Sequence, residues 1–286
     1  MKKLIVRTIT GATFVAALIG SMLYSHVTFG AMFMLITLLA VNEFCTLVEQ
    51  HKKTTFNKWI AIAGGCVLFL ASFFVFNFEV ANPLKLFLPY IFANPLRLFL
   101  PYILIMAYAF IGQLFDKNGK TLDNVAYFSL SQVYAALPFA LLNMLAAGHN
   151  GYSFVLPLSI FIFIWSNDTG AFCFGCTLGR HKMFERVSPK KTWEGFAGGA
   201  LVAVVAGYVM SLYFNIMDMY QWMGMALVVV VFATLGDLIE SSMKREMQIK
   251  DSGNMLPGHG GILDRFDSTL LAIPAVIIYL NLIGIL

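Results

Sequence analysis

Long apolar segments recur along almost the whole chain, and they limit its fold more than any other feature. The 286 residues are 59% hydrophobic, and the mean hydropathy is +0.78. No soluble core could bury so much apolar surface, so a bilayer must act as the solvent, and a helix needs roughly 20 residues to cross it. We therefore expect an all-α, polytopic integral membrane protein. Its predicted spans number about nine and lie near residues 9–25, 28–48, 59–78, 92–112, 125–147, 153–173, 195–215, 221–242 and 266–286.

The distribution of basic residues predicts a cytoplasmic N-terminus. If nine spans start from the inside, 17 of the 19 Lys and Arg residues fall on the inner face, and only Lys85 and Arg97 fall outside. The positive-inside rule demands such a split. The net charge of +4 mostly reflects this bias, so it does not call for a nucleic-acid partner. The long polar connections at 174–194 and 243–265 are also on the inner side, where we expect the chemistry.

The same pattern predicts one polytopic membrane domain over residues 1–286. Residues 1–150 are expected to supply N-terminal helices for scaffolding, lipid access or oligomer contacts. Residues 151–286 are expected to supply the catalytic helices and cytoplasmic loops. We interpret the first apolar run as a retained span, because no clear small-residue cleavage site follows it.

A short internal repeat interrupts the pattern of spans. The segment 81–92 reads ANPLKLFLPYIF, and 93–104 reads ANPLRLFLPYIL. One copy as a helix would cover roughly 18 Å, too little to cross a bilayer, and its two prolines disfavour a smooth helix. We interpret the repeat as a local duplication in an outer loop, with a re-entrant or interfacial segment as the alternative. The start of the fourth span is therefore open.

Charged and polar residues crowd into 242–267, between the last two predicted spans, in a chain that is only 12% charged. Just ahead of this segment, Asp237, Ser241 and Lys244 follow one another at i, i+4 and i+7 and so share one helical face. Glu240 lies beside them. A carboxylate deep in a bilayer costs around 2.5–3.5 kcal/mol on insertion scales, and such residues usually face a bundle interior. The alternative is an Asp that reaches interfacial water at a helix end.

Glycine-rich stretches follow at 250–253 (KDSG) and 257–261 (PGHGG). Glycines let backbone N–H groups approach an anion closely. Immediately afterwards Asp264 and Asp267 stand at i and i+3 on one face at the start of the ninth span. Helix capping and the macrodipole alone could explain one of these two acids.

Asp237, Asp264 and Asp267 can converge if the eighth and ninth spans pack as an antiparallel pair. Carboxylates at close range repel one another, and a divalent cation resolves this. All-oxygen ligation favours Mg²⁺ over Zn²⁺, and Mg²⁺ normally completes its shell with substrate phosphates. Basic residues for phosphate binding are then available at Lys244, Arg245, Lys250 and Arg265.

The other inner loop reads SPKKTWEG over 188–195 and is followed by Gly198 and Gly199. Two lysines, two hydroxyls and glycines at the start of the seventh span predict a second anion site. An ordinary positive-inside loop is the alternative. Asp168, at the inner end of the sixth span, is either a further carboxylate of the site or an interfacial acid. For Glu43, near the inner end of the second span, we favour an interfacial acid.

These residues resemble one family closely. The sequence reads SMKR at 242–245, KD at 250–251 and HGGILDRFD at 259–267. It closely resembles the long signature of phosphatidate cytidylyltransferases, also called CDP-diacylglycerol synthases, which runs S-x-x-K-R, four spacer residues, K-D, H-G-G, two residues and D-R-x-D. The 188–195 loop and the DTGA segment at 168–171 also resemble the family. The resemblance is dense over roughly 165–270 and loose before that, where only the layout of many spans agrees.

The resemblance implies that CTP and phosphatidic acid react to give CDP-diacylglycerol and pyrophosphate, with Mg²⁺ and room for a second cation. It also implies a bacterial inner membrane with the active site facing the cytoplasm, and it is compatible with a homodimer. The expected catalytic residues are Asp237, Lys244, Asp264 and Asp267. The expected metal ligands are Asp237, Asp264 and Asp267, with Asp168 as a further candidate. The expected substrate-binding residues are Ser188, Lys190, Lys191, Thr192, Ser241, Arg245, Lys250, Asp251, His259, Gly260, Gly261 and Arg265.

Two other functions compete with this interpretation. A CTP-dependent lipid or polyprenol kinase would transfer the γ-phosphoryl group and release CDP. An ion-coupled transporter would use Asp237 and Asp168 as coupling acids, but its acids should lie near the midplane and its two halves should match. Here the acids gather at one face, which disfavours a transporter.

Overall fold

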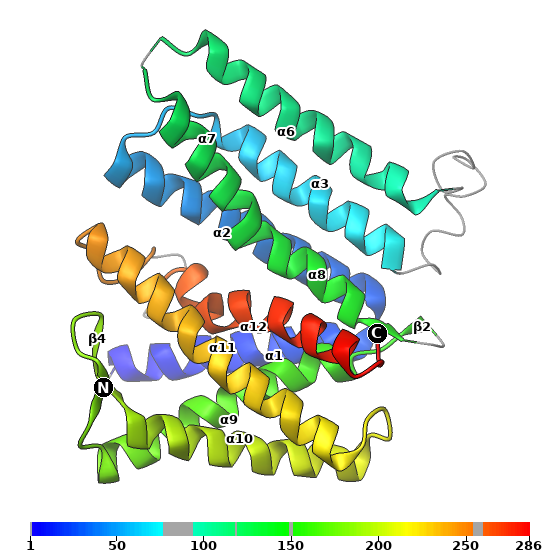
Figure 1. The fold of residues 1–286 in the computed structure, drawn as a ribbon, viewed down its shortest axis with the longest axis vertical. Helices are drawn as coiled ribbons and strands as arrows, with labels where there is room; N and C mark the ends of the chain where they lie inside the picture. The colour runs from blue at the N-terminus through cyan, green and yellow to red at the C-terminus, as the bar shows by residue number, and fades with distance from the viewer. Residues whose placement is uncertain (1, 77–93, 118, 149–150, 254–259) are drawn as a thin grey trace. The chain divides into compact units, whose positions relative to one another are not determined.

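The computed structural model describes residues 2–76, 94–117, 119–148, 151–253 and 260–286, and these are mostly helical (Figure 1). The chain forms two compact units. The first comprises residues 1–154 and 251–265, and the second comprises 155–250 and 266–286. The first copy of the internal repeat, at 81–92, lies outside the described residues.

The first unit is built from apolar helices that begin and end at recognisable signals. Ser25 caps α2 in a capping box with Thr28, and Lys53 ends that helix in a left-handed conformation (φ 54°). Pro95 opens the short helix η1, where the missing N–H of proline costs no hydrogen bond. The helices are α1 (Lys2–Tyr24), α2 (His26–Lys52), α3 (Lys58–Phe76), η1 (Pro95–Phe99), α6 (Leu100–Gly112), η2 (Gln113–Phe115), α7 (Thr121–Leu130), the π-helical η3 (Ser131–Ala136) and α8 (Leu137–Leu145).

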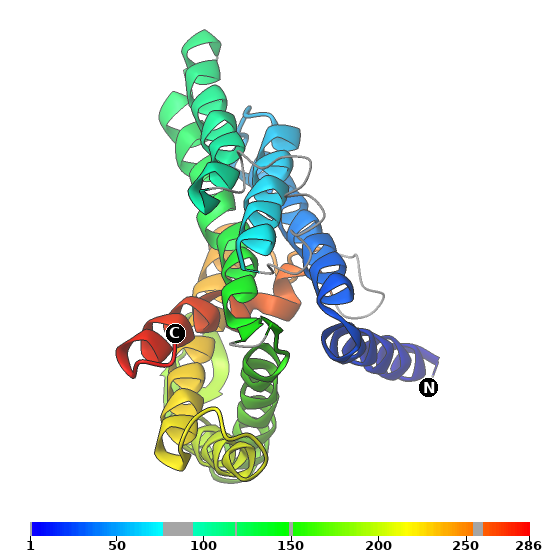
Figure 2. The same cartoon turned by 90° about the vertical axis from the view of Figure 1, so that its right-hand side faces the viewer.

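Within this unit α2 and α3 run side by side (Figure 2), and η3 and α8 pack against both. Phe29, Phe33 and Phe139 are completely buried between them. Polar side chains in this core bond to backbone carbonyls of neighbouring helices, as Gln132 Nε2 does to Ala61 O at 2.9 Å. Buried polar groups need such partners. A short pair of strands, β1 (Ala147–Gly148) and β2 (Gly151–Tyr152), follows α8.

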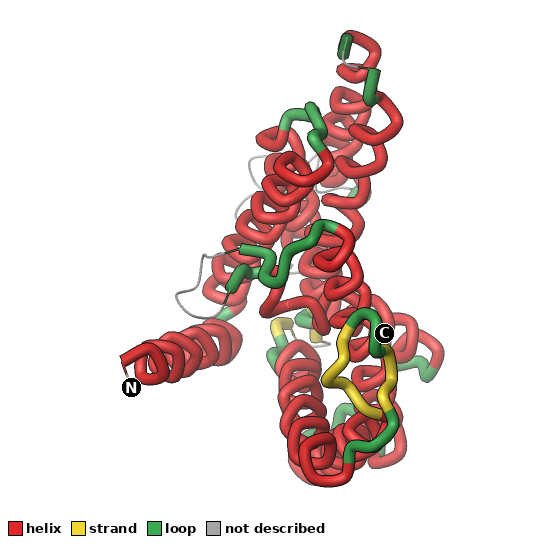
Figure 3. Tube along the Cα trace, turned by 90° about the vertical axis from the view of Figure 1, so that its left-hand side faces the viewer, coloured by secondary structure: helices red, strands yellow, loops and turns green. Residues whose placement is uncertain are grey.

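The second unit contains α9 (Val155–Leu178), α10 (Trp193–Tyr213), α11 (Met219–Glu246) and most of α12 (Leu263–Leu282). Small residues bring α9 and α10 unusually close together. A methyl group at Gly170 would lie only 2.8 Å from the carbonyl oxygen of Gly198. The connection between the two helices is an antiparallel hairpin of β3 (Lys182–Phe184) and β4 (Ser188–Thr192), drawn in yellow in Figure 3. The polar loop expected here from the sequence is therefore a structured hairpin.

Where the structure describes them, the nine predicted spans fall mainly on a helix or on a continuous run of helices. In the part of the chain that the structure describes, seven helical stretches are long and apolar enough to cross a membrane. α1 contributes only a shorter apolar stretch, Thr8–Tyr24, and α12 is not among the seven. The protein is therefore an all-α polytopic membrane protein by length and composition. The qualifying stretches are His26–Lys52, Lys58–Phe76, Leu96–Phe115, Thr121–Leu145, Val155–Leu178, Trp193–Tyr213 and Met219–Glu246.

Candidate active site

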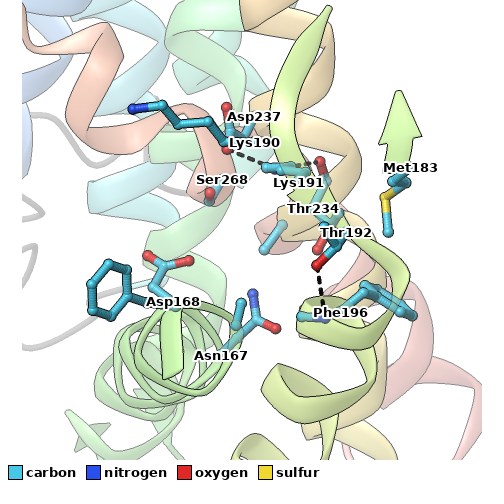
Figure 4. A pocket seen from close by; sticks show the side chains of 14 residues that line it. Asn167, Asp168, Met183, Lys190, Lys191, Thr192, Phe196, Thr234, Asp237 and Ser268 are labelled. Atoms are coloured by element: carbon cyan, nitrogen blue, oxygen red, sulfur yellow. Dashed lines mark hydrogen bonds and ion pairs between the residues drawn. The ribbon is translucent and has the colours of Figure 1, made fainter. Parts of the chain in front are cut away.

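A pocket of about 200 Å³ lies in the second unit, and both acidic and basic side chains line it (Figure 4). Its walls come from α9, the β3–β4 hairpin, α10, α11 and α12. This combination of opposite charges around one cavity suits phosphate groups accompanied by a cation. The lining residues are Asn167, Asp168, Ala171, Phe172, Met183, Lys190, Lys191, Thr192, Gly195, Phe196, Ala233, Thr234, Asp237 and Ser268.

Asp237 of α11 makes an ion pair and a side-chain hydrogen bond in this pocket. Its Oδ2 atom lies 2.6 Å from Lys191 Nζ, and its Oδ1 atom accepts a hydrogen bond from Ser241 Oγ at 3.1 Å. The side chains of Lys191 and Asp237 remain 27% and 32% exposed. The two charges therefore neutralise each other at a position that water and a ligand can still reach. The spacing of Asp237 and Ser241 predicted that they share one face of the helix, and this hydrogen bond lies on that face.

Asp168 of α9 lines the same pocket and is exposed to it. It interacts electrostatically with both Asp237 and Lys191. Figure 4 shows Asp168 and Asp237 coming from different helices to one cavity. Lys190 lines the pocket as well, so two carboxylates and two lysines face the same cavity.

Both lysines lie on β4, directly before the start of α10. Thr192 ends β4 and caps α10, since its Oγ1 accepts the Gly195 N–H at 3.1 Å. The cap fixes the register of the two preceding residues relative to α10. Lys190 is exposed and Lys191 is half-buried. Ser188 lies at the far end of β4 and is not among the residues that line the pocket.

Gly198 and Gly199 have a different role from the anion binding proposed for them. Both are buried on the face of α10 that packs against α9. A methyl group at Gly198 would collide with the ring of Phe174, and one at Gly199 would collide with the Asn167 side chain. These glycines permit close helix packing.

The end of α11 carries the remaining basic residues of the signature. Lys244 Nζ lies 3.3 Å from Glu240 Oε1, and both side chains are largely buried. Arg245 is exposed and donates to the carbonyl of Ile249 at 3.3 Å. Lys250 is exposed. The predicted catalytic residue Lys244 is therefore engaged with an acid of its own helix.

Asp267 directly precedes Ser268, which is one of the residues that line the pocket. Its Oδ1 atom accepts the N–H of Ser268 at 2.5 Å, and it interacts electrostatically with Asp237 and Lys244. Gly236 of α11 lets the backbone of Asp267 approach, because a methyl group there would lie 2.5 Å from the Asp267 carbonyl oxygen.

Asp264 belongs to the first unit and organises the loop that precedes α12. Its Oδ2 atom accepts the N–H groups of Ser252 at 2.8 Å and Gly261 at 2.9 Å. Gly260 beside it has a φ of +84°, a left-handed conformation in which a side chain would be strained. Asp251 and Arg265 are exposed. His259, a predicted substrate ligand, lies outside the described residues.

Among the described residues no three His, Cys, Asp or Glu side chains gather to hold a metal ion, and the convergence of Asp237, Asp264 and Asp267 stays a prediction. Asp237 and Asp267 belong to the second unit, and Asp264 belongs to the first. The acid that shares the pocket with Asp237 is Asp168.

Several pocket residues were missed by sequence reasoning. Phe172, Met183 and Phe196 are apolar residues in apolar surroundings, so no local pattern distinguishes them. Asn167 is 6% exposed and its Oδ1 atom is without a hydrogen-bond partner; its position next to Asp168 was the available signal. Glu43 was interpreted as an interfacial acid, yet it is buried and bonded to the loop before α12.

The family model and the curated relatives that match this chain are all cytidylyltransferases. The model of the family described as "Cytidylyltransferase family" matches residues 5–283. The phosphatidate cytidylyltransferase of Bacillus subtilis (strain 168) is 40% identical over 160 residues, which cover 55% of this chain and 59% of that protein. The enzyme of the same name from Staphylococcus aureus (strain COL) is 39% identical over 166 residues, covering 57% of this chain and 62% of that protein. The matched part thus spans about three fifths of the length of these curated relatives.

Proposed function

Because the chain belongs to the cytidylyltransferase family, we propose that it transfers the cytidylyl group of CTP to phosphatidic acid, giving CDP-diacylglycerol and pyrophosphate. Relatives at about 40% identity carry the name phosphatidate cytidylyltransferase. One observation from the structure carries the proposal: Lys190, Lys191, Asp168 and Asp237 line a single pocket.

The reaction brings two anions together, so charge repulsion is its main obstacle. The ammonium groups of Lys190 and Lys191 are placed to bind phosphate oxygens and to offset the charge that the leaving pyrophosphate gains. Preorganised charges of this kind usually supply the largest part of catalysis in phosphoryl and nucleotidyl transfer. The volume of about 200 Å³ is below the 300–1,000 Å³ of typical sites for whole small molecules. The pocket therefore suits the phosphate chain rather than the complete nucleotide.

The nucleophile requires little activation. An oxygen of the phosphatidic acid phosphate attacks the α-phosphorus of CTP, the bond to the β-phosphate oxygen breaks, and pyrophosphate leaves. A phosphate monoester has a second pKa near 6 and is largely dianionic at neutral pH. No side chain has to act as a general base, so the task of the protein is to align and neutralise the two reactants.

The donor set of the pocket fits Mg²⁺. This ion is usually held by one or two carboxylates and completes its shell with substrate phosphates and water. Asp237 and Asp168 are the two carboxylates that the pocket offers, with Asp267 close to them. Bound there, Mg²⁺ would supply neutralisation of phosphate charge, and a second cation is compatible with the proposal.

We further propose nine spans with a cytoplasmic N-terminus, in a bacterial inner membrane and with the site facing the cytoplasm. The seven qualifying helical stretches and the bias of Lys and Arg support this topology. A substrate embedded in the bilayer could then enter sideways between helices. The bilayer itself and a second copy of the chain are the remaining proposed partners.

A label-transfer assay tests the proposed function. Purified protein in lipid nanodiscs receives phosphatidic acid, Mg²⁺ and CTP labelled either at the α- or at the γ-phosphorus. We expect the α-label in a lipid product and the γ-label in pyrophosphate. Transfer of the γ-label to lipid, with release of CDP, would identify a lipid kinase instead. If neither label reaches lipid while a bacterial relative is active under the same conditions, the proposal is wrong.

A further inference from the structure

Glu43 of α2 is a buried carboxylate that the proposed reaction does not use. Its side chain is 7% exposed. It lies in the first unit, as do the residues 252–253 and 261–263 that it contacts. An isolated ionised carboxylate is very costly to bury, so such a group is retained only where donors surround it.

Three donors converge on this carboxylate. The N–H of Ile262 donates to Oε2 at 2.8 Å, the N–H of Leu263 donates to Oε1 at 3.1 Å, and Ser252 Oγ makes a short hydrogen bond to Oε1. Leu263 is the first residue of α12. The amides at the start of a helix have no acceptor inside the helix, and a negative charge there is favoured by the helix dipole. Glu43 therefore caps α12 from a helix that is more than 200 positions away in sequence.

The loop is shaped to admit this carboxylate. A methyl group at Gly261 would collide with Glu43 Oε1, and one at Gly253 would lie 3.0 Å from Oε2. The glycines therefore leave room for a carboxylate that belongs to the protein itself. The Gly261 N–H is likewise committed, since it donates to Asp264.

Ser252 links Glu43 to Asp264. Its hydroxyl oxygen accepts the N–H of Asp264 at 3.3 Å while the hydroxyl bonds to Glu43, and its own N–H donates to Asp264 Oδ2 at 2.8 Å. The position of the Asp264 carboxylate thus depends on Ser252, and the position of Ser252 depends on Glu43.

We propose that Glu43 is a positioning residue, which acts by fixing the segments of its own unit that present Asp251, Gly260, Gly261 and Asp264, four residues that the sequence signature predicts to bind substrate or metal. The proposal rests on the proposed function for its catalytic consequence. Its structural part, the bonds between Glu43 and the amides of α12, stands independently of the reaction.

The test compares Glu43→Gln with Glu49→Gln in the full-length protein in nanodiscs. Glu49 lies on the same helix and is exposed, so the control makes the same chemical change away from the loop. Glutamine preserves the size of the side chain but turns an amide donor toward the loop N–H groups. Hydrogen exchange of the peptide that covers 260–264 is followed by mass spectrometry. Turnover and the KM for CTP are measured on the folded fraction of each variant.

We expect the 260–264 amides to exchange at least about tenfold faster in Glu43→Gln, with exchange elsewhere in α2 unchanged. Loss of a supporting residue of this kind typically costs about 10- to 100-fold, and we expect kcat to fall by that factor. If Glu43→Gln does not fold, Ser252→Ala replaces it, because that variant keeps the two amide bonds of Glu43 and removes the hydroxyl that joins Glu43 to the Asp264 N–H. It should also lower kcat and speed exchange at Asp264.

Two results would overturn the proposal. One is exchange at 260–264 that matches the Glu49→Gln control. The other is normal turnover per folded molecule despite faster exchange, which would leave Glu43 with a purely structural role. If the wild-type protein has no cytidylyltransferase activity, the proposed function fails, and the exchange comparison alone decides whether Glu43 holds the loop.

Discussion

Replacing Asp237 by Asn separates the catalytic role of this residue from its structural one. The change keeps the volume of the side chain and removes the negative charge that faces Lys191 at 2.6 Å. Coulomb attraction between two unit charges at 4 Å is about 4 kcal/mol at an effective dielectric of 20. Both side chains here retain about a third of their exposure, and exposed pairs are worth only about 0.2–1 kcal/mol. A half-buried pair falls between these limits, so we expect the free energy of unfolding to drop by about 1–2 kcal/mol.

The expected loss of activity is much larger than this loss of stability. Removing one preorganised electrostatic group from an active site typically lowers kcat by about 10²–10³-fold, or about 2.7–4 kcal/mol. A stability loss of about 1–2 kcal/mol still leaves nearly all molecules folded, because proteins are typically stable by about 5–15 kcal/mol. Partial unfolding therefore cannot produce such a drop in turnover.

The assay measures thermal unfolding and CDP-diacylglycerol formation on the same nanodisc preparation. Asp123→Asn is the matched control, because Asp123 is an exposed carboxylate in the first turn of α7. We expect near-normal turnover for the control and a loss of about 10²-fold or more for Asp237→Asn. Turnover of folded Asp237→Asn within about threefold of the wild type would show that the Asp237 charge has no catalytic role.

Three further predictions concern neighbouring residues. Lys190→Met should raise the KM for CTP by about tenfold or more in steady-state kinetics, because one phosphate-binding charge is lost; an unchanged KM would remove Lys190 from the site. Thr192→Ala removes the cap of α10 and should cost about 0.5–2 kcal/mol of stability, and an unaltered melting temperature would contradict that role. Gly261→Ala forces a methyl group against Glu43 and should lower turnover at least about tenfold, whereas Gly112→Ala, with open space around it, should not. Equal activities of the two alanine variants would show that the loop tolerates displacement.

The helices were the most predictable part of the structure. A run of about 20 apolar residues is a local signal, and the described part of each predicted span is mainly helical, including 125–147, where α7, η3 and α8 are continuous. Periodicity along one helix also predicted that Asp237 and Ser241 share a face, where the two are hydrogen-bonded. Both kinds of inference use only residues that are close in sequence.

Contacts between distant segments were beyond the reach of the same reasoning. Lys191, which pairs with Asp237, lies on another element, and no local pattern links the two residues. Gly199 was interpreted as part of an anion site because the sequence does not show that its neighbour is Asn167. Glu43 is 219 positions from Ile262, so only the folded chain shows that it is a cap rather than an interfacial acid.

The most direct test of the central claim is to locate bound CTP. A CTP analogue with a photoreactive group on its γ-phosphate is cross-linked to the wild-type protein in nanodiscs, and the modified peptide is identified by mass spectrometry. The account predicts labelling on β4 and the first turn of α10, around Lys190 and Lys191, that excess CTP abolishes. Labelling that CTP protects but that maps only to segments away from this pocket would contradict it.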